Sequence, residues 1–207
     1  DKSPDEEREL VCIPTVSPAP DFYAAETRGD GKNLFGNTLL ALNANTGERL
    51  WHYQMIHHDL WDYDLPAAPT LVTIEKDGKE VDAVVQVTKH GLVFVLDRET
   101  GEPLFPVEER PVPESRIEGE EAWPTQPVPV RPEPLTRHHV TEEDLTDISP
   151  EAREYALKRF REMHYEGPFT PLGEKETLVY PGSRGGAEWG GASYDPDNNM
   201  LYVNVND

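Results

Sequence analysis

The chain contains a single cysteine and few basic residues. Cys12 cannot form an internal disulfide or contribute to a cysteine-rich metal site, so we expect it to be a small buried apolar residue. Only 19 lysines and arginines stand against 40 aspartates and glutamates, which gives a net charge of −21. A chain this acidic repels the phosphates of nucleic acid, and this excludes nucleic acid as a partner.

Long apolar runs are also missing. No stretch approaches the roughly 18 apolar residues that span a bilayer, and no signal peptide is recognisable. The chain begins at Asp1 without an initiator Met, so the missing signal does not identify a compartment. Turn-forming residues are plentiful instead: 20 prolines and 15 glycines predict many turns and little continuous helix.

An internal repeat predicts β-hairpins. Residues 42–51 (LNANTGERLW) match residues 96–105 (LDRETGEPLF) at a constant offset of 54, each with an apolar strand, a Thr-Gly turn and a large aromatic. Residues 192–205 form a third, degenerate copy. Repeats of this size, with four short strands each, are typical of propeller blades. Because two blades and part of a third cannot close a ring, we expect a segment of a longer protein.

The predicted organisation is one partial propeller domain over residues 1–207. Blade hairpins that carry the candidate active-site loop are expected over 33–105, a Pro/Glu-rich and helical insertion over 106–176, and the start of a further blade over 177–207. Asp77-Gly78 is a strong hairpin turn between two strand-like runs.

Three finer expectations concern the second half of the chain. Residues 106–134 are rich in proline and suit an extended, polyproline-like path rather than a ladder. Residues 150–164 form a helix that Ser149 caps, and its apolar stripe packs on the propeller surface. Residues 177–180 form a strand, and the glycine-rich loop after them is not a phosphate-binding loop, because it lacks the Lys-Ser/Thr ending.

The densest cluster of functional groups is residues 57–66 (HHDLWDYDLP). Such a cluster after a strand indicates either a site or a turn whose aspartates cap backbone N–H groups while its aromatics fill a gap between sheets. Asp59 and Asp64 suit the capping role. His57 and His58 point to opposite faces of an extended strand and so suit a hydrogen-bonding scaffold. The pair His138-His139 is expected at the surface, because its spacing matches no zinc signature.

Several motifs in one order resemble the pyrroloquinoline quinone (PQQ)-dependent dehydrogenases. They are residues 39–54 (LLALNANTGERLWHYQ), 57–67 (HHDLWDYDLPA), 89–91 (KHG), 124–127 (PTQP) and 188–191 (EWGG). The resemblance extends over about residues 33–206 and is greater to the branch of membrane-bound quinoprotein glucose dehydrogenase with quinate and polyol dehydrogenases. It implies an all-β, eight-bladed propeller of four-stranded antiparallel blades, with the quinone near the axis.

The same resemblance implies roles for individual residues. Asp62 would be the general base, and Lys89, 27 positions later, would reach the quinone carbonyls. Asn204 or Asn206, together with Trp189, would contact PQQ. Calcium or magnesium would bind mainly through residues upstream of this segment, and Asp62 could add one oxygen to it.

The implied function is oxidation of a sugar, polyol or cyclic alcohol by hydride transfer to PQQ, with electrons passed to a respiratory quinone or cytochrome. A periplasmic or periplasm-facing location is expected, with membrane association possible through parts outside this chain. The isolated segment is expected to be inactive, because half of its cofactor site is missing. The alternative is a non-catalytic propeller of the same repeat type that serves as a protein-binding scaffold. Such a scaffold needs neither residues 57–66 nor Lys89.

Overall fold

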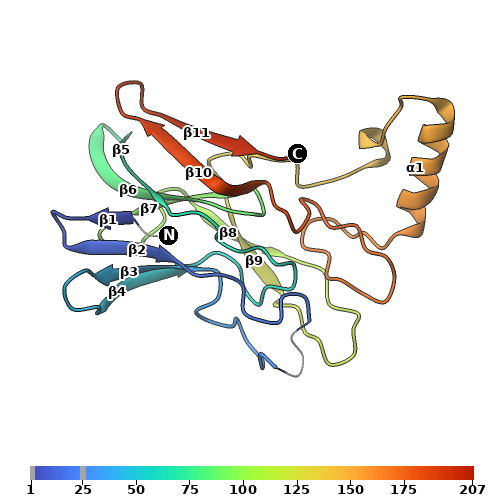
Figure 1. Cartoon of the computed structure of the whole chain (residues 1–207), viewed down its shortest axis with the longest axis horizontal. Helices are drawn as coiled ribbons and strands as arrows, with labels where there is room; N and C mark the ends of the chain where they lie inside the picture. The colour runs from blue at the N-terminus through green and yellow to red at the C-terminus, as the bar shows by residue number, and fades with distance from the viewer. Residues whose placement is uncertain (1–2, 24–26) are drawn as a thin grey trace.

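Antiparallel β-sheets packed beside one another make up the body of the chain, and an α-helix stands apart from them (Figure 1). This arrangement comes from a computed structural model, which describes residues 3–23 and 27–207. Among these residues the strands form one four-stranded sheet, one three-stranded sheet and two hairpins.

The first sheet has the strand order β1-β2-β3-β4, with every neighbouring pair antiparallel. Its strands are Ser3–Asp5, Leu10–Pro14, Thr38–Asn43 and Arg49–Gln54. Cys12 on β2 is completely buried, as predicted. Four antiparallel strands in sequence order are what the repeat predicted for a complete blade.

The second sheet has the order β5-β6-β7, formed by Thr70–Lys76, Lys79–Val87 and Val93–Asp97. Asp77 and Gly78, at φ 53° and 75°, connect β5 to β6, which confirms the predicted hairpin turn. Both faces of the sheet are buried along residues 83–87 of β6 and 93–96 of β7, because consecutive residues such as Val84 and Val85 point to opposite faces and belong to different apolar clusters. The second sheet is therefore the middle layer of the chain.

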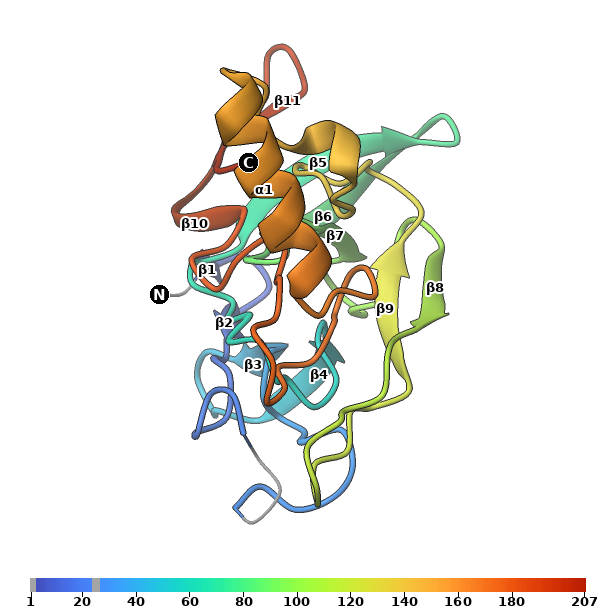
Figure 2. The same ribbon diagram turned by 90° about the vertical axis from the view of Figure 1, so that its right-hand side faces the viewer.

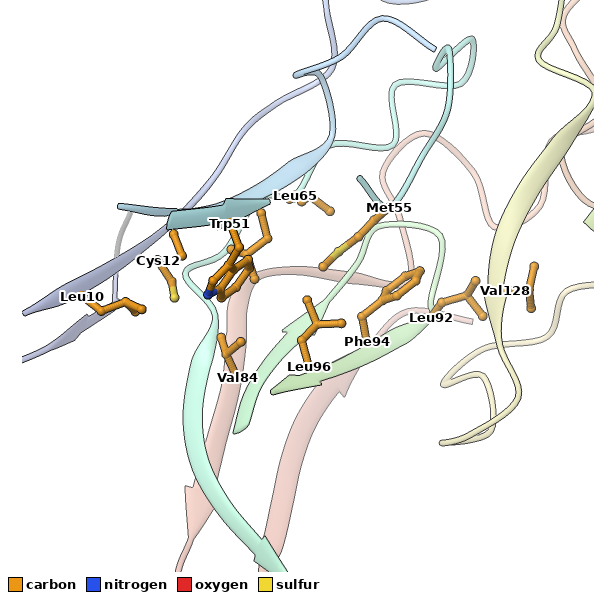
Figure 3. Packing of buried hydrophobic residues seen from close by; sticks show 12 residues of the cluster. Leu10, Cys12, Trp51, Met55, Leu65, Val84, Leu92, Phe94, Leu96 and Val128 are labelled. Atoms are coloured by element: carbon orange, nitrogen blue, oxygen red, sulfur yellow. The ribbon is translucent and has the colours of Figure 1, made fainter. Parts of the chain in front are cut away.

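Trp51 packs between the first and second sheets (Figure 3). Its ring lies among Leu10 and Cys12 from its own sheet and Val84 and Leu96 from the next. Its Nε1 donates a hydrogen bond of 3.1 Å to the carbonyl of Arg98, so that the polar edge of the ring is satisfied on burial.

The two clear repeat copies fold into equivalent turns. Asn43 Oδ1 accepts backbone N–H bonds from the residues two and three positions later, both at 2.9 Å, and Asp97 Oδ1 does the same at 3.0 and 2.9 Å. Gly47 and Gly101 follow at φ 74° and 75°. The local chemistry of an Asx side chain and a left-handed glycine therefore sets both turns.

The second copy ends differently from the first. In the first copy the chain continues as β4, whereas in the second only Pro103 forms an isolated bridge, to Leu96. Backbone bonds of 2.8 Å from the Asp97 N–H to the Glu102 carbonyl and from the Leu104 N–H to the Val95 carbonyl flank this bridge, and the pairing extends no further.

The third copy is the β10-β11 hairpin, formed by Ala187–Asp195 and Met200–Val205. Asn199, at φ 53°, stands where the other copies have glycine. The strand predicted at residues 177–180 is absent, because only Thr177 makes a bridge, to His164. The new sheet begins at Ala187 instead.

The prediction of a ladder-free path over residues 106–134 was wrong. Strands β8 (Val107–Pro111) and β9 (Thr125–Pro129) pair as an antiparallel hairpin. Pro111, Pro127 and Pro129 all fall in alternate cross-strand pairs, and the intervening pairs supply the hydrogen bonds. Backbone bonds from Val112 to Pro124 and from Val130 to Pro106 continue this alternation.

The helix α1 (Pro150–Glu162) begins as predicted, since the Ser149 hydroxyl accepts the Ala152 N–H at 3.2 Å. Its apolar stripe does not pack on the sheets. No residue of α1 is buried, and Tyr155 is 67% exposed. The helix stands apart from the sheets in Figure 1, and in Figure 2, turned by 90°, it lies in front of them. Polar contacts hold it to its own insertion, including an ion pair of 2.7 Å from Arg161 to Glu142 in the 3-10 helix Glu142–Asp144.

Candidate functional site

The polar loop of residues 57–66 connects β4 to β5, and Asp59 organises it. The Asp59 carboxylate is buried and accepts the backbone N–H groups of Trp61 at 2.8 Å and Tyr63 at 2.7 Å. Asn37 Nδ2 adds a third bond of 3.0 Å. Although burial raises the pKa of Asp59, this set of donors is the one expected of a turn-capping carboxylate, as predicted.

Side chains alternate along the second half of the loop. Trp61 and Tyr63 are buried and stack on each other, with ring centroids 6.1 Å apart. Their polar atoms reach the rest of the chain: Trp61 Nε1 donates to the Thr170 carbonyl at 2.9 Å, and the Tyr63 hydroxyl donates to the Pro181 carbonyl at 2.5 Å. The aspartates between and after them, at positions 62 and 64, are partly exposed.

Lys89 meets both of these partly exposed aspartates. It follows β6, and its Nζ donates to the Asp62 backbone carbonyl at 2.6 Å and to Asp62 Oδ2 at 2.9 Å. Asp64 Oδ2 lies 3.6 Å from the same ammonium. Asp62 itself adopts φ 60°, a left-handed conformation that is uncommon for a residue other than glycine. The two residues singled out in the sequence are therefore in direct contact.

A pocket of about 670 Å³ opens beside this contact. Lys89 and Asp64 line it on one side, and the segment leading into β10 lines the other. The full lining is Val16, Asp64, Pro66, Lys89, Ser183, Arg184, Glu188, Trp189 and Asn206. Of the predicted cofactor contacts, the structure brings Lys89, Trp189 and Asn206 together. Asp62 adjoins the pocket through Lys89, and Asn204 is not among the lining residues.

Gly185 allows the loop before β10 to close over Lys89. A Cβ at this position would lie 2.5 Å from Lys89 Cγ and 3.0 Å from Glu188 Oε1, and its φ is 77°. A side chain there would push the two walls of the pocket apart. Asn206 ties the same loop, because its backbone N–H donates to the Gly186 carbonyl at 2.8 Å.

The charged groups around Lys89 shift one another's pKa values. Burial raises the pKa of Asp62, and the hydrogen bond and charge of Lys89 oppose that shift without reversing it. Burial lowers the pKa of Lys89, but the hydrogen bond to Asp62 and the charges of Asp62, Asp64 and Glu188 outweigh it, so the net shift is upward. Burial also raises the pKa of Glu188. The site therefore holds a charged ammonium beside carboxyls that take up protons more readily than usual.

Sequence reasoning missed part of this group. Asp64 does cap the chain, since its Oδ1 accepts the Ser17 N–H at 2.6 Å, but it also faces Lys89. The alternation of Asp62 and Asp64 with buried aromatics was the available signal, because side chains two apart share a face. Glu188 and Arg184 gave no such signal, since only the tertiary fold brings them to Lys89.

The histidines make hydrogen bonds within the protein, as a scaffold would. His57 Nε2 lies 3.1 Å from Glu109 Oε1, and His58 Nδ1 lies 2.7 Å from the Gly31 carbonyl. His139 is at the surface as expected, but His138 is half-buried and Nε2 of its ring bonds the His90 carbonyl at 2.8 Å. Within residues 3–23 and 27–207, no three His, Cys, Asp or Glu side chains are grouped as a metal site.

The comparisons with known proteins agree with this architecture. Antiparallel sheets packed face to face, with an aromatic of one docked on a turn of the next, define the chain as part of a β-propeller. Residues 2–207 match the model of the PQQ family described as the glucose/ethanol/alcohol dehydrogenase β-propeller domain, and the chain belongs to that family.

Relatives of known type are similar over nearly the whole chain. It is 40% identical to the glycerol dehydrogenase large subunit of Gluconobacter thailandicus, covering 98% of this chain and 28% of that protein. It is 41% identical to a probable quinate dehydrogenase (quinone) of Xanthomonas campestris pv. juglandis, covering 94% and 25%. A solved europium-containing methanol dehydrogenase superposes with a TM-score of 0.65 at 25% identity, covering all of this chain and 29% of that one. The chain thus spans about a quarter of the length of these proteins.

In the part of the chain that the structure describes, no helix is both long and apolar enough to cross a bilayer.

Proposed function

We propose that this chain forms about a quarter of a PQQ-dependent dehydrogenase that oxidises a sugar, polyol or cyclic alcohol. The observation that carries the proposal is the contact of Lys89 with Asp62 at the edge of a pocket that Trp189 and Asn206 also line. A protein-binding scaffold would not require a lysine that is 7% exposed and held among three acidic residues, because burying such a charge costs stability.

The residues around the pocket fit an anionic, planar quinone. Trp189 is 79% exposed, so it offers a free aromatic face on which a flat ring system can stack. Lys89 and Arg184 supply positive charge, and the Asn206 amide supplies a neutral donor. The close approach at Gly185 keeps this set compact. Lys89, Arg184, Asn206 and Trp189 would therefore hold the cofactor in this part of the protein.

The chemistry divides between the cofactor and the chain. PQQ, when bound, supplies a quinone that accepts hydride from the alcohol carbon. Lys89 places a fixed ammonium where negative charge develops, and its raised pKa keeps it protonated. Asp62 accepts the hydroxyl proton of the substrate, a role that a carboxylate with a raised pKa performs more readily near neutral pH.

Three further features belong to the proposal. Calcium or magnesium would bind chiefly through parts outside this chain, with one oxygen from Asp62. Electrons would pass from the cofactor to a respiratory quinone or cytochrome. The protein would work in the periplasm or facing it, where membrane association would come from segments outside these 207 residues.

The test uses the full-length protein that contains this chain, reconstituted with PQQ and calcium. Dye reduction is followed over a panel of aldoses, polyols and quinate, with a cofactor-free sample as control. Turnover on at least one member of the panel, dependent on PQQ, is expected. No turnover on any of them, together with no quinone absorbance retained after dialysis, would contradict the proposal.

A further inference from the structure

We infer that the β8-β9 hairpin of the insertion positions the loop that carries Asp62, and that Gln126 is the positioning residue through which it does so. The catalytic consequence rests on the proposed function, whereas the contact itself is a property of the fold. On this inference the insertion contributes to the site through its hairpin, although its helix α1 stands apart from the sheets (Figure 1).

Gln126 bonds both backbone groups of His57, the first residue of the loop. Its side chain is completely buried. Oε1 accepts the His57 N–H at 2.8 Å, and Nε2 donates to the His57 carbonyl at 2.7 Å. One amide thus pairs with a backbone N–H and a backbone C=O, as a neighbouring strand would. An apolar side chain of similar volume would leave both His57 groups buried without partners.

The hairpin makes a second tie to the same residue. The His57 ring lies 3.1 Å from Glu109 on β8, and the other carboxylate oxygen of Glu109 accepts the Thr125 hydroxyl at 2.6 Å. Both strands of the hairpin therefore reach His57. Pro127 follows Gln126 and restricts it to extended backbone, which fixes the face on which the amide emerges.

The loop between His57 and Asp62 couples the position of Asp62 to that of His57. Asp59 closes a turn by accepting two backbone N–H groups within four residues, so this part of the chain moves as one unit. The Trp61 indole adds a third contact with the insertion through its bond to the Thr170 carbonyl. Displacing His57 therefore displaces Asp62 relative to Lys89.

The experiment compares wild type, Gln126→Leu and Gln126→Glu in the full-length protein, with Arg110→Ala as the matched control. Arg110 is the cross-strand partner of Gln126, but its exposed side chain bonds to Glu108 on its own strand. Hydrogen exchange reads the backbone of residues 57–63, and steady-state kinetics gives kcat and KM separately.

In Gln126→Leu, amide exchange over residues 57–63 should be at least about tenfold faster, with exchange in β6 and β7 unchanged. Misplacing Asp62 should lower kcat about 10- to 100-fold while KM changes little. Arg110→Ala should match wild type in both measurements. In Gln126→Glu, the ratio of variant to wild-type kcat should rise as the pH falls, because only the protonated acid can both donate to and accept from His57.

Unchanged exchange over residues 57–63 in both Gln126 variants would overturn the inference, as would faster exchange with unchanged kcat. If Gln126→Leu fails to fold, Gln126→Glu replaces it: a ratio of variant to wild-type kcat that is the same at two pH values would overturn the inference. A wild-type protein without turnover on any substrate counts against the proposed function instead. In that case the exchange measurement still decides whether Gln126 positions the loop.

Discussion

Replacing Gly101 with alanine tests how the first two sheets are joined. Gly101 has φ 75°, and a Cβ built there would lie 2.6 Å from two ring atoms of Trp51. Gly47 occupies the same position in the first repeat copy at φ 74°, with nothing within 4 Å of such a Cβ. The two glycines therefore share the backbone conformation and differ in the contact with Trp51.

The structure sets the expected loss of stability at each position. A left-handed alanine costs about 1–2 kcal/mol, and this applies to both variants. At Gly101 the methyl also has to displace a ring that is 8% exposed and held through Nε1 by a hydrogen bond of 3.1 Å. Overpacking of this kind costs about 1–3 kcal/mol more. We therefore expect losses of about 1–2 kcal/mol for Gly47→Ala and about 2–5 kcal/mol for Gly101→Ala.

Urea unfolding of the 207-residue chain, followed by circular dichroism, measures both losses. In a Trp51→Ala background, Gly101→Ala should cost no more than Gly47→Ala, because the colliding ring is gone. Equal losses for the two single variants, or an undiminished loss at Gly101 without Trp51, would refute the docking of the Trp51 ring on this turn.

Three further predictions concern the site and the charges. Asp62→Asn should abolish turnover of the full-length protein and leave cofactor retention largely intact. Because burial raises the pKa of Asp62, wild-type kcat/KM should fall, as the pH is lowered, at a pH above the 3.8 usual for aspartate; unchanged turnover in the variant would remove Asp62 from its role. Burial holds the pKa of His90 well below 6.5, so the unfolded chain takes up the proton first as the pH falls below that value. The contribution of His90 should therefore lower the free energy of unfolding by about 1–1.5 kcal/mol between pH 7.5 and pH 5.5, and His90→Phe should lack this part of the decrease; identical slopes in urea titrations would count against this. Arg98→Met should cost about 1.5–3 kcal/mol by the same assay, because it removes a buried ion pair of 3.0 Å to Asp5 and the bonds to the Val72 and Ala83 carbonyls while Arg8 stays paired with Asp5; Arg110→Met, in an exposed pair, should cost under about 1 kcal/mol.

Much of the fold could be predicted because its turns are local chemistry. Asn43 and Asp97 each bond their own backbone, and the glycines that follow adopt the left-handed conformation that the turns require. The β8-β9 ladder could not be predicted from proline content. Prolines are compatible with a ladder when they all occupy positions whose N–H points away from the partner strand. Which positions those are is known only once the pairing register of the two strands is known.

The stripe on α1 shows a different limit. Helical periodicity identifies an apolar face but not the surface it meets, and here Phe160 packs on Tyr165 of the same insertion, with ring centroids 6.0 Å apart. In the site, family resemblance singled out Asp62 and Lys89, and the structure places the two in contact. Residues 188–191 were part of the family resemblance, but the approach of Glu188 to Lys89 depends on the close packing of the loop at Gly185, which is a tertiary contact.

A structure of the full-length protein with PQQ bound would test the central claim most directly. The measured quantity is the distance from the Lys89 Nζ to the nearest quinone oxygen. The proposal predicts about 3 Å, a hydrogen-bonding distance, with the ring system against Trp189. A cofactor bound elsewhere, with Lys89 still paired only to Asp62 and Asp64, would contradict it.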